Sequence, residues 1–336
     1  MTDSDQPSRS FRSPVVALIL ALGVVLLVIS IRQAGTDSIV ASFRSVGAWL
    51  LAVLALGAAR MAFRARAWSI CSRVDEQSGI PFGAAFAATL AADALGNLTP
   101  LGLLASEPTK VIMGRRHVPT AASLSSVAVE NGFYTVSVIA MLLGGVWVLL
   151  QRADVPAAIE RIGEAIVAAS LVAGLAGLWV FRTRPAVLSR VEGLVARVRR
   201  RPARTDALTA LETSIYDVAH WPARRSLHVA AWEVLFHAAA VAEVWLILRT
   251  MPGGSQTTLV DAFLMETTGR FITVAFKFVP YRLGIDEVGS GSVSQLLGLG
   301  TSAGVTLALV RRLRILLLNA LGIALLARER ARGAAA

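Results

Sequence analysis

The chain has 336 residues, of which 55% are hydrophobic and 16% are charged, and its mean hydropathy is +0.63. This balance excludes an ordinary soluble globular domain. The formal net charge of +11 comes mostly from arginine. Because these arginines stand between apolar runs, they favour membrane orientation and contact with anionic headgroups over nucleic-acid binding.

The sequence offers little to metal or covalent chemistry. Cys71 is the single cysteine, which excludes a disulfide within the chain, and the four histidines lack metal-ligand spacing. The sequence contains no Gly-x-Ser-x-Gly, His-Glu-x-x-His or phosphate-loop motif. We therefore expect no cofactor, no metal and no enzymatic activity; a membrane-embedded enzyme is the least favoured alternative.

Six apolar stretches are long enough to cross the hydrocarbon core, which takes about 20 residues. They cover residues 14–31, 46–63, 120–150, 163–181, 226–248 and 304–327. No small-residue cleavage pattern follows the first stretch, so we expect it to be a retained helix rather than a signal peptide.

Two further apolar stretches, residues 82–98 and 258–279, each run into a break that contains proline and glycine. Pro100 and Pro280 mark these breaks, and only a short, weakly apolar segment follows each. Such a pattern predicts a re-entrant hairpin or a broken helix. The sequence thus predicts an all-α polytopic membrane protein with about six full transmembrane helices and two re-entrant hairpins.

Basic residues in short loops predict the orientation of the chain. With the N-terminus inside, the basic clusters in 64–73, 110–116 and 182–225, and those after 327, all fall on one side. We therefore expect a multi-pass protein of a bacterial inner membrane with both termini in the cytoplasm. Residues 185–217 are expected to form either a basic amphipathic helix on the membrane surface or a solvated linker.

A shift of 180 residues places Pro100 on Pro280 and Glu107 on Glu287, and the flanking helices match in type. An odd number of crossings separates the copies, so the repeat would be inverted, as in many secondary transporters. The alternative is that helices rich in alanine and leucine align by composition alone. The expected organisation is an N-terminal helix and loop (1–45), a first membrane repeat (46–150), a connecting helix with a basic segment (151–225) and a second, inverted repeat (226–336).

Ionisable side chains at membrane depth cost about 2.5–3.5 kcal/mol on insertion scales, so each is a candidate for function. Glu107 and Glu287 follow the two breaks, where they could couple to a proton or cation or gate a path. Arg311 and Arg312 are repeat-related to Glu130 and its neighbour. We expect these groups to meet at the hairpin tips and to hold a lipid phosphate by forked hydrogen bonds. The expected substrate-binding residues are Glu107, Lys110, Glu130, Asn131, Arg282, Gly284, Glu287, Arg311 and Arg312.

A plainer interpretation of these charges remains open: Glu107 or Glu287 would only neutralise Arg311 or Arg312 inside the helix bundle. Three other arginines are expected to have structural roles. Arg60 and Arg64 are expected to snorkel from a helix end to the interface, and Arg314 is expected either to snorkel or to pack between helices.

Two pairs of charged or polar residues have i, i+4 spacing. Glu266 and Arg270 are expected to form an intrahelical ion pair. Glu233 and His237 are expected to pack as a hydrogen-bonded pair, with a proton relay as the alternative. The tryptophans fall mostly near span ends, as an interfacial belt requires.

The two breaks also carry a family resemblance. The segment Pro280-Tyr281-Arg282-Leu283-Gly284-Ile285-Asp286-Glu287, followed by Leu297-Gly298 and Arg311, resembles the C-terminal signature of the lysylphosphatidylglycerol synthase transmembrane-region family, also called flippase-like membrane proteins. That signature reads roughly Pro-Gly-Gly-Leu-Gly-Val-x-Glu, then Leu-Gly, then Arg. Asn97-Leu98-Thr99-Pro100 to Glu107, with Glu130-Asn131 further on, is similar to the family's N-terminal motif.

The chain departs from the family pattern at several positions. Tyr281 and Arg282 replace glycines, Ala105-Ser106 precede Glu107 where glycines are common, and Asn131 stands where arginine is expected. Bulky side chains at the second break could close or re-tune a pathway that glycines would leave open.

In bifunctional members of the family, this region translocates aminoacylated phosphatidylglycerol made by a separate synthase domain. No such domain is expected in these 336 residues, so the resemblance implies no lysyl transfer. It implies a translocator of a phospholipid or lipid-linked headgroup, with membrane lipids, above all anionic phospholipid, as partners. The alternative is a non-transporting membrane partner of a lipid-modifying enzyme or glycosyltransferase. A homo-oligomer is also left open.

Overall fold

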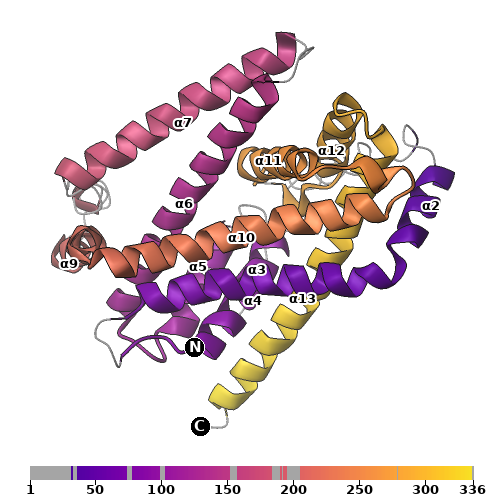
Figure 1. Ribbon diagram of the computed structural model, residues 1–336. Coiled ribbons are helices and arrows are strands. Elements are labelled where there is room, and N and C mark those ends of the chain that lie inside the picture. Colours follow the sequence, from indigo (N-terminus) through magenta and orange to yellow (C-terminus); the bar gives the residue numbers. More distant parts are fainter. Residues whose placement is uncertain are drawn as a thin grey trace. The chain divides into compact units, whose positions relative to one another are not determined.

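The computed structural model describes residues 32, 36–73, 78–98, 103–151, 157–183, 190, 192–194, 205–277 and 279–334. This part of the chain consists of helices and their connections, with no strand, which confirms the all-α prediction (Figure 1). Four helical stretches are long and apolar enough to cross a membrane: Arg44–Cys71, Thr120–Leu150, Glu160–Val180 and Ala223–Thr250.

The helices fall into long and short classes. The long helices are α3 (Leu50–Cys71), α6 (Thr120–Leu150), α7 (Ala157–Thr183), α10 (Ala223–Thr250) and α13 (Thr301–Ala334). The shorter helices are α2 (Thr36–Val46), α4 (Phe82–Leu98), α5 (Leu103–Gly114), α9 (Thr205–Tyr216), α11 (Leu259–Ala275) and α12 (Ile285–Leu296). Single 3₁₀ turns are η2 (Gly47–Trp49), η3 (Asp217–His220), η4 (Gly254–Gln256) and η5 (Pro280–Arg282).

The helix bounds refine the predicted spans. α3 ends at Cys71 rather than at residue 63, because the arginines near the predicted end are accommodated inside the helix, as described below. α13 contains the predicted span 304–327 but is not among the four apolar candidates. Its apolar stretch is interrupted by arginines, so the count of six spans stays a prediction.

Three predictions fall wholly or partly on residues outside the described part of the chain. They concern the first span (14–31), the break at Pro100 and most of residues 185–204 in the expected segment 185–217. The end of that segment contains the helix α9.

Helix lengths recur along the chain in the way that the predicted repeat requires. α4 and α11 have 17 residues each, and α5 and α12 have 12 residues each. In both copies a long helix precedes the short pair and another follows it: α3 and α6 in the first copy, α10 and α13 in the second. The inversion of the second copy and the re-entrant course of the short helices remain predictions.

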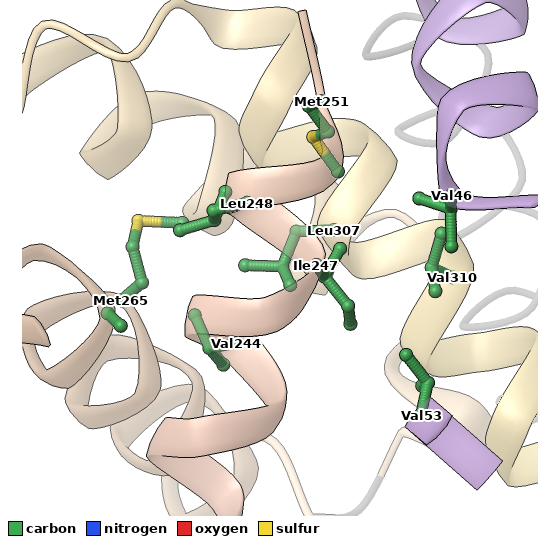
Figure 2. Packing of buried hydrophobic residues seen from close by; sticks show 10 residues of the cluster. Val46, Val53, Val244, Ile247, Leu248, Met251, Met265, Leu307 and Val310 are labelled. Carbon is green, nitrogen blue, oxygen red and sulfur yellow. The ribbon is translucent and has the colours of Figure 1, made fainter. Parts of the chain in front are cut away.

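One compact unit comprises the described residues within 1–57, 93–106 and 240–323. Its core is a cluster of buried apolar side chains from α2, α3, α10, α11 and α13 (Figure 2). The cluster comprises Val46, Val53, Val244, Ile247, Leu248, Met251, Ala262, Met265, Leu307 and Val310. In the same unit α11 packs against α12. This packing positions Glu266 on α11 and Glu287 on α12, two carboxylates that pair with arginines of α13.

The second compact unit comprises residues 58–92, 107–239 and 324–336, and in it α6 packs against α7 and α9. Trp68 lies in one of its apolar clusters and is fully buried, and its Nε1 donates to Ser126 Oγ at 3.0 Å. Trp68 thus lies near the end of α3, as expected, but it packs inside the protein rather than on its surface. Trp147 and Trp179, by contrast, are exposed near the ends of their helices.

The outer surface of α7 is apolar. Leu171, Val172, Leu175, Leu178 and Trp179 are all more than half exposed. An exposed apolar stripe of this length would be unfavourable in water, whereas lipid tails cover it without cost. α7 therefore has the surface of a lipid-facing span.

Candidate functional site

The break between α11 and α12 holds two residues in a left-handed backbone conformation. Tyr281 has a φ of 51° and Arg282 a φ of 48°, and Gly284, with a φ of 78°, precedes the first turn of α12. Glycine adopts such angles freely, but a residue with a Cβ pays about 1–2 kcal/mol. Pro280 and Gly284 predicted this break from the sequence. The two residues with strained backbone angles, Tyr281 and Arg282, lie between them.

Glu287 lies in the first turn of α12 and is fully buried. Arg312 of α13 forms a two-pronged ion pair with it: Nη1 contacts Oε1, and Nη2 donates to Oε2 at 3.1 Å. The same Nη2 lies 3.4 Å from the carbonyl oxygen of Tyr281. Arg312 thus holds both the start of α12 and the strained turn before it.

Glu266 of α11 is a second fully buried carboxylate and lies between two arginines. Arg270, one helical turn further on, donates from Nη2 to Oε1 at 2.6 Å, which confirms the predicted intrahelical pair. Arg311 Nη2 lies 2.7 Å from Oε2 of the same carboxylate. One negative charge therefore faces two guanidiniums.

Arg314 pairs with a third buried carboxylate. Its Nη1 donates to Glu243 Oε2 of α10 at 2.6 Å. A Cβ added to Gly57 would lie 2.5 Å from the Arg314 Cδ, so the arginine stem fills the space that this glycine leaves open. Of the two expectations for Arg314, helix packing is confirmed and snorkelling is wrong, because α10 provides a buried counter-ion.

The buried ion pairs of Glu243, Glu266 and Glu287 with their arginines form the first charge cluster. This cluster borders a small cavity of about 30 Å³ in the first unit. The described residues that line it are Asn97, Tyr281, Arg282, Asp286, Ser290, Ala308, Arg311, Arg312 and Ile315. Arg282 Nε lies 3.2 and 3.3 Å from the two carboxylate oxygens of Asp286, which holds its guanidinium at the cavity. The predicted residues Arg282, Arg311 and Arg312 therefore meet at one cavity.

The arginines that line this cavity have N–H donors that an anion could use. Glu287 accepts a hydrogen bond from Arg312, and Glu266 forms an ion pair with Arg311; both arginines also line the cavity. A guanidinium carries five N–H donors, so a carboxylate that uses one or two of them leaves others for a ligand. The resulting arrangement suits forked recognition of phosphate or carboxylate oxygens.

The second unit contains its own charge cluster, around Glu130 of α6. This carboxylate is fully buried, and Arg64 of α3 donates to Oε1 from Nε at 2.8 Å and from Nη2 at 2.6 Å. Lys110 of α5 donates from Nζ to Oε2 at 3.0 Å. Two cations from two helices therefore hold one carboxylate.

Asn131 links this cluster to the first predicted hairpin. Its Nδ2 donates to Glu107 Oε2 at 2.8 Å, and its Oδ1 lies 3.3 Å from Arg64 Nη2. The Arg64 guanidinium carbon also lies 4.1 Å from the centre of the Tyr134 ring. The predicted residues Glu107, Lys110, Glu130 and Asn131 thus form one network within the second unit.

Two expectations for these residues are corrected. Arg60 is only 4% exposed and its guanidinium carbon lies 4.9 Å from the Phe236 ring centre, while Arg64 is bound to Glu130. Neither arginine lies at the end of its helix as snorkelling requires, because α3 extends beyond both; Arg60 is buried, and Arg64, with its side chain 18% exposed, is held by Glu130. Glu130 was expected to face Arg311 and Arg312, whereas its partners are Arg64 and Lys110.

His237 of α10 contacts α6, since its Nε2 lies 2.9 Å from Ser137 Oγ. Its ring also stacks at 6.3 Å on that of Tyr134. These contacts are those of a packed, hydrogen-bonded histidine. The predicted contact with Glu233 stays a prediction.

Sequence reasoning missed several contributors to the two clusters. They are Arg64 and Glu243 as ion-pair partners, Glu266 as the partner of Arg311, and Asn97, Tyr281, Asp286 and Ser290 as cavity residues. The charged ones carried a signal, because each interrupts an apolar helix. The uncharged ones carried none beyond their proximity to the two breaks.

Comparisons with known proteins bear on the whole chain. The family described as lysylphosphatidylglycerol synthase TM region matches residues 15–322. Neither the curated proteins nor the solved structures gave a match. Among the described residues, no group of three or more histidine, cysteine, aspartate or glutamate side chains is placed to hold a metal ion.

Proposed function

Because the chain belongs to the lysylphosphatidylglycerol synthase TM region family and is an integral membrane protein, we propose that it translocates lipid across the membrane. The moving group would be the headgroup of a phospholipid or of a lipid-linked molecule. The reaction makes and breaks no covalent bond, so we propose a transport protein rather than an enzyme. We place it in a bacterial inner membrane with both termini in the cytoplasm, where its basic segments face anionic lipid.

The arginine-lined cavity of the first unit carries this proposal. Arg311 and Arg312 project from α13, within an otherwise apolar stretch, toward the same cavity as Arg282. Charged side chains in such helices are costly and usually mark a substrate path. Guanidiniums bind phosphate oxygens in a two-pronged geometry, so the headgroup phosphate is the part of the lipid that this cavity would take.

The buried carboxylates would keep the site ready when it is empty. Glu287 and Glu266 neutralise arginines that otherwise face the cavity without an anion. An arriving phosphate would compete with these carboxylates for the guanidinium donors. We propose that this exchange of partners, at Glu287 above all, gates the path, and that Glu107 plays the corresponding role in the other repeat.

Lipid translocation in proteoliposomes tests the proposal. A fluorescent phospholipid in the inner leaflet becomes accessible to an external quencher only after it has been moved. Glu287→Gln removes the carboxylate charge, and Arg311→Ala removes one guanidinium from the cavity. We expect both variants to slow translocation, whereas Arg328→Ala, an exposed arginine on the same helix, should not.

Unchanged translocation in both cavity variants would remove the proposed site. Absence of translocation in the unaltered protein, together with stable co-purification of a lipid-modifying enzyme, would favour the non-transporting membrane partner instead.

A further inference from the structure

We infer that Tyr281 and Arg282 restrict the cavity to a terminal phosphate, so that the chain prefers a lipid phosphomonoester over lipids with a larger headgroup. This inference rests on the proposed function and names the substrate class of the same site. It concerns two side chains that stand where the family pattern has glycine.

The backbone at these two residues indicates that their side chains matter. Both hold a positive φ, 51° and 48°, which glycine would adopt without strain. Strained conformations at non-glycine residues persist where the surrounding structure enforces them, and they concentrate at functional sites. Tyrosine and arginine at these positions therefore add backbone strain to the folded state that glycine would not add.

Both residues line the cavity. Arg282 is held by the two Asp286 oxygens at 3.2 and 3.3 Å, and its side chain is 14% exposed. The Tyr281 carbonyl oxygen lies 3.4 Å from Arg312 Nη2. The strained turn is therefore tied to the arginine that would bind phosphate, and Arg282 adds a further guanidinium beside it.

The size of the cavity limits what can enter. Its volume is about 30 Å³, and holding one water molecule takes at least roughly 10–15 Å³. Such a cavity has room for about two or three water-sized groups, such as the terminal oxygens of a phosphate, while a glycerol or aminoacyl group attached to the phosphate would have to remain outside. Glycines in place of Tyr281 and Arg282 would remove two of the side chains that narrow it.

The charge of the lining favours a phosphomonoester further. Among the described lining residues, Arg282, Arg311 and Arg312 are basic and Asp286 is acidic. A phosphomonoester carries about −1.5 to −2 charges at pH 7 and offers three terminal oxygens. A phosphodiester headgroup carries one charge and two such oxygens, so it can engage fewer of the guanidinium donors.

Ligand binding to the purified full-length protein in detergent tests the inference. The probes are short-chain phosphatidic acid, short-chain phosphatidylglycerol and inorganic phosphate. We expect phosphatidic acid to bind about tenfold more tightly than phosphatidylglycerol, with inorganic phosphate the weakest. Inorganic phosphate that binds as tightly as phosphatidic acid would identify a free-anion site and overturn the lipid assignment.

The double variant Tyr281→Gly with Arg282→Gly isolates the two side chains. Both positions already have angles that glycine favours, so we expect the variant to fold. The preference for phosphatidic acid should fall below about threefold. Lys277→Gly is the matched control: it removes an exposed cation from the same connection outside the cavity lining, and it should leave the preference unchanged.

Two results would overturn the inference while the proposed function stands. One is equal binding and translocation of the two lipids by the unaltered protein, and the other is an undiminished preference in the double glycine variant. If neither lipid binds and neither is moved, the proposed function itself is overturned.

Discussion

Glu287 and Arg312 face each other with both carboxylate oxygens and both terminal nitrogens, Nη1 on Oε1 and Nη2 3.1 Å from Oε2. The carboxylate belongs to the first turn of α12, where the N-terminal end of the helix favours negative charge. The guanidinium belongs to α13 and also borders the cavity. One residue pair therefore joins a helix start, a long helix and the proposed phosphate site.

Arg312→Lys tests whether the two-pronged geometry matters. Lysine keeps the positive charge, but its single ammonium cannot reproduce the fork. We expect translocation in proteoliposomes to fall by about tenfold, the change that corresponds to about 1.4 kcal/mol. Arg328→Lys, at an exposed position of the same helix, serves as control. An Arg312→Lys variant as active as the unaltered protein would show that charge alone suffices.

Arg314→Ala should lower the stability of the protein without changing the residues that line the cavity. The substitution leaves Glu243 buried without its 2.6 Å partner, and breaking a buried pair in this way costs about 3–5 kcal/mol. SDS-induced unfolding measures the loss. Replacing both partners, by Glu243→Gln and Arg314→Met, should recover most of it. If the double variant is no more stable than Arg314→Ala, the pair does not account for the loss.

Gly269→Ala should affect function more than stability. The added Cβ would lie 3.0 Å from Arg311 Nη1, and the flexible end of that side chain can move away. Because the guanidinium moves at the cavity, we expect slower translocation with a change in unfolding free energy below about 1 kcal/mol. Gly132→Ala in α6 is the comparison, since no atom lies within 4 Å of its added Cβ. Equal effects of the two substitutions would argue against a role for the Arg311 position.

Arg64 and Lys110 should be coupled through Glu130. Either cation alone still neutralises the carboxylate, whereas removing both leaves a buried charge unpaired. A double-mutant cycle with Arg64→Met and Lys110→Met should therefore show a coupling energy of about 0.5–3 kcal/mol. Adding Glu130→Gln should remove most of that coupling. Strictly additive losses would mean that Glu130 is not the shared partner.

Helix identity and approximate bounds followed from hydropathy, since apolar runs such as 120–150 and 226–248 correspond to α6 and α10 within a few residues. The break between α11 and α12 could also be predicted from the sequence, because Pro280 and Gly284 interrupt an apolar run. Both signals are local: they depend on residues that are neighbours in sequence.

The partners of the charges could not be predicted in the same way. Arg311 and Arg312 are adjacent in sequence, yet successive residues of an α-helix point about 100° apart. One therefore reaches Glu266 on α11 and the other Glu287 on α12. The choice among several carboxylates depends on how the helices pack, which no local pattern contains.

The error at Arg64 has a related origin. Hydropathy placed the end of its helix at residue 63 because arginines follow, and an arginine at a helix end normally reaches water. Glu130 lies 66 positions away in sequence and supplies the buried partner that keeps α3 helical to Cys71. A counter-ion distant in sequence thus allows Arg64 to lie within the helix rather than at its end.

α13 is tied to three neighbours by three closely spaced arginines: Arg311 to α11, Arg312 to α12 and Arg314 to α10. Each of these ion pairs uses a different carboxylate. An anion that draws one guanidinium away would therefore release one ion pair and leave the other two in place. α13 would keep its contacts with two of the three neighbours during that exchange.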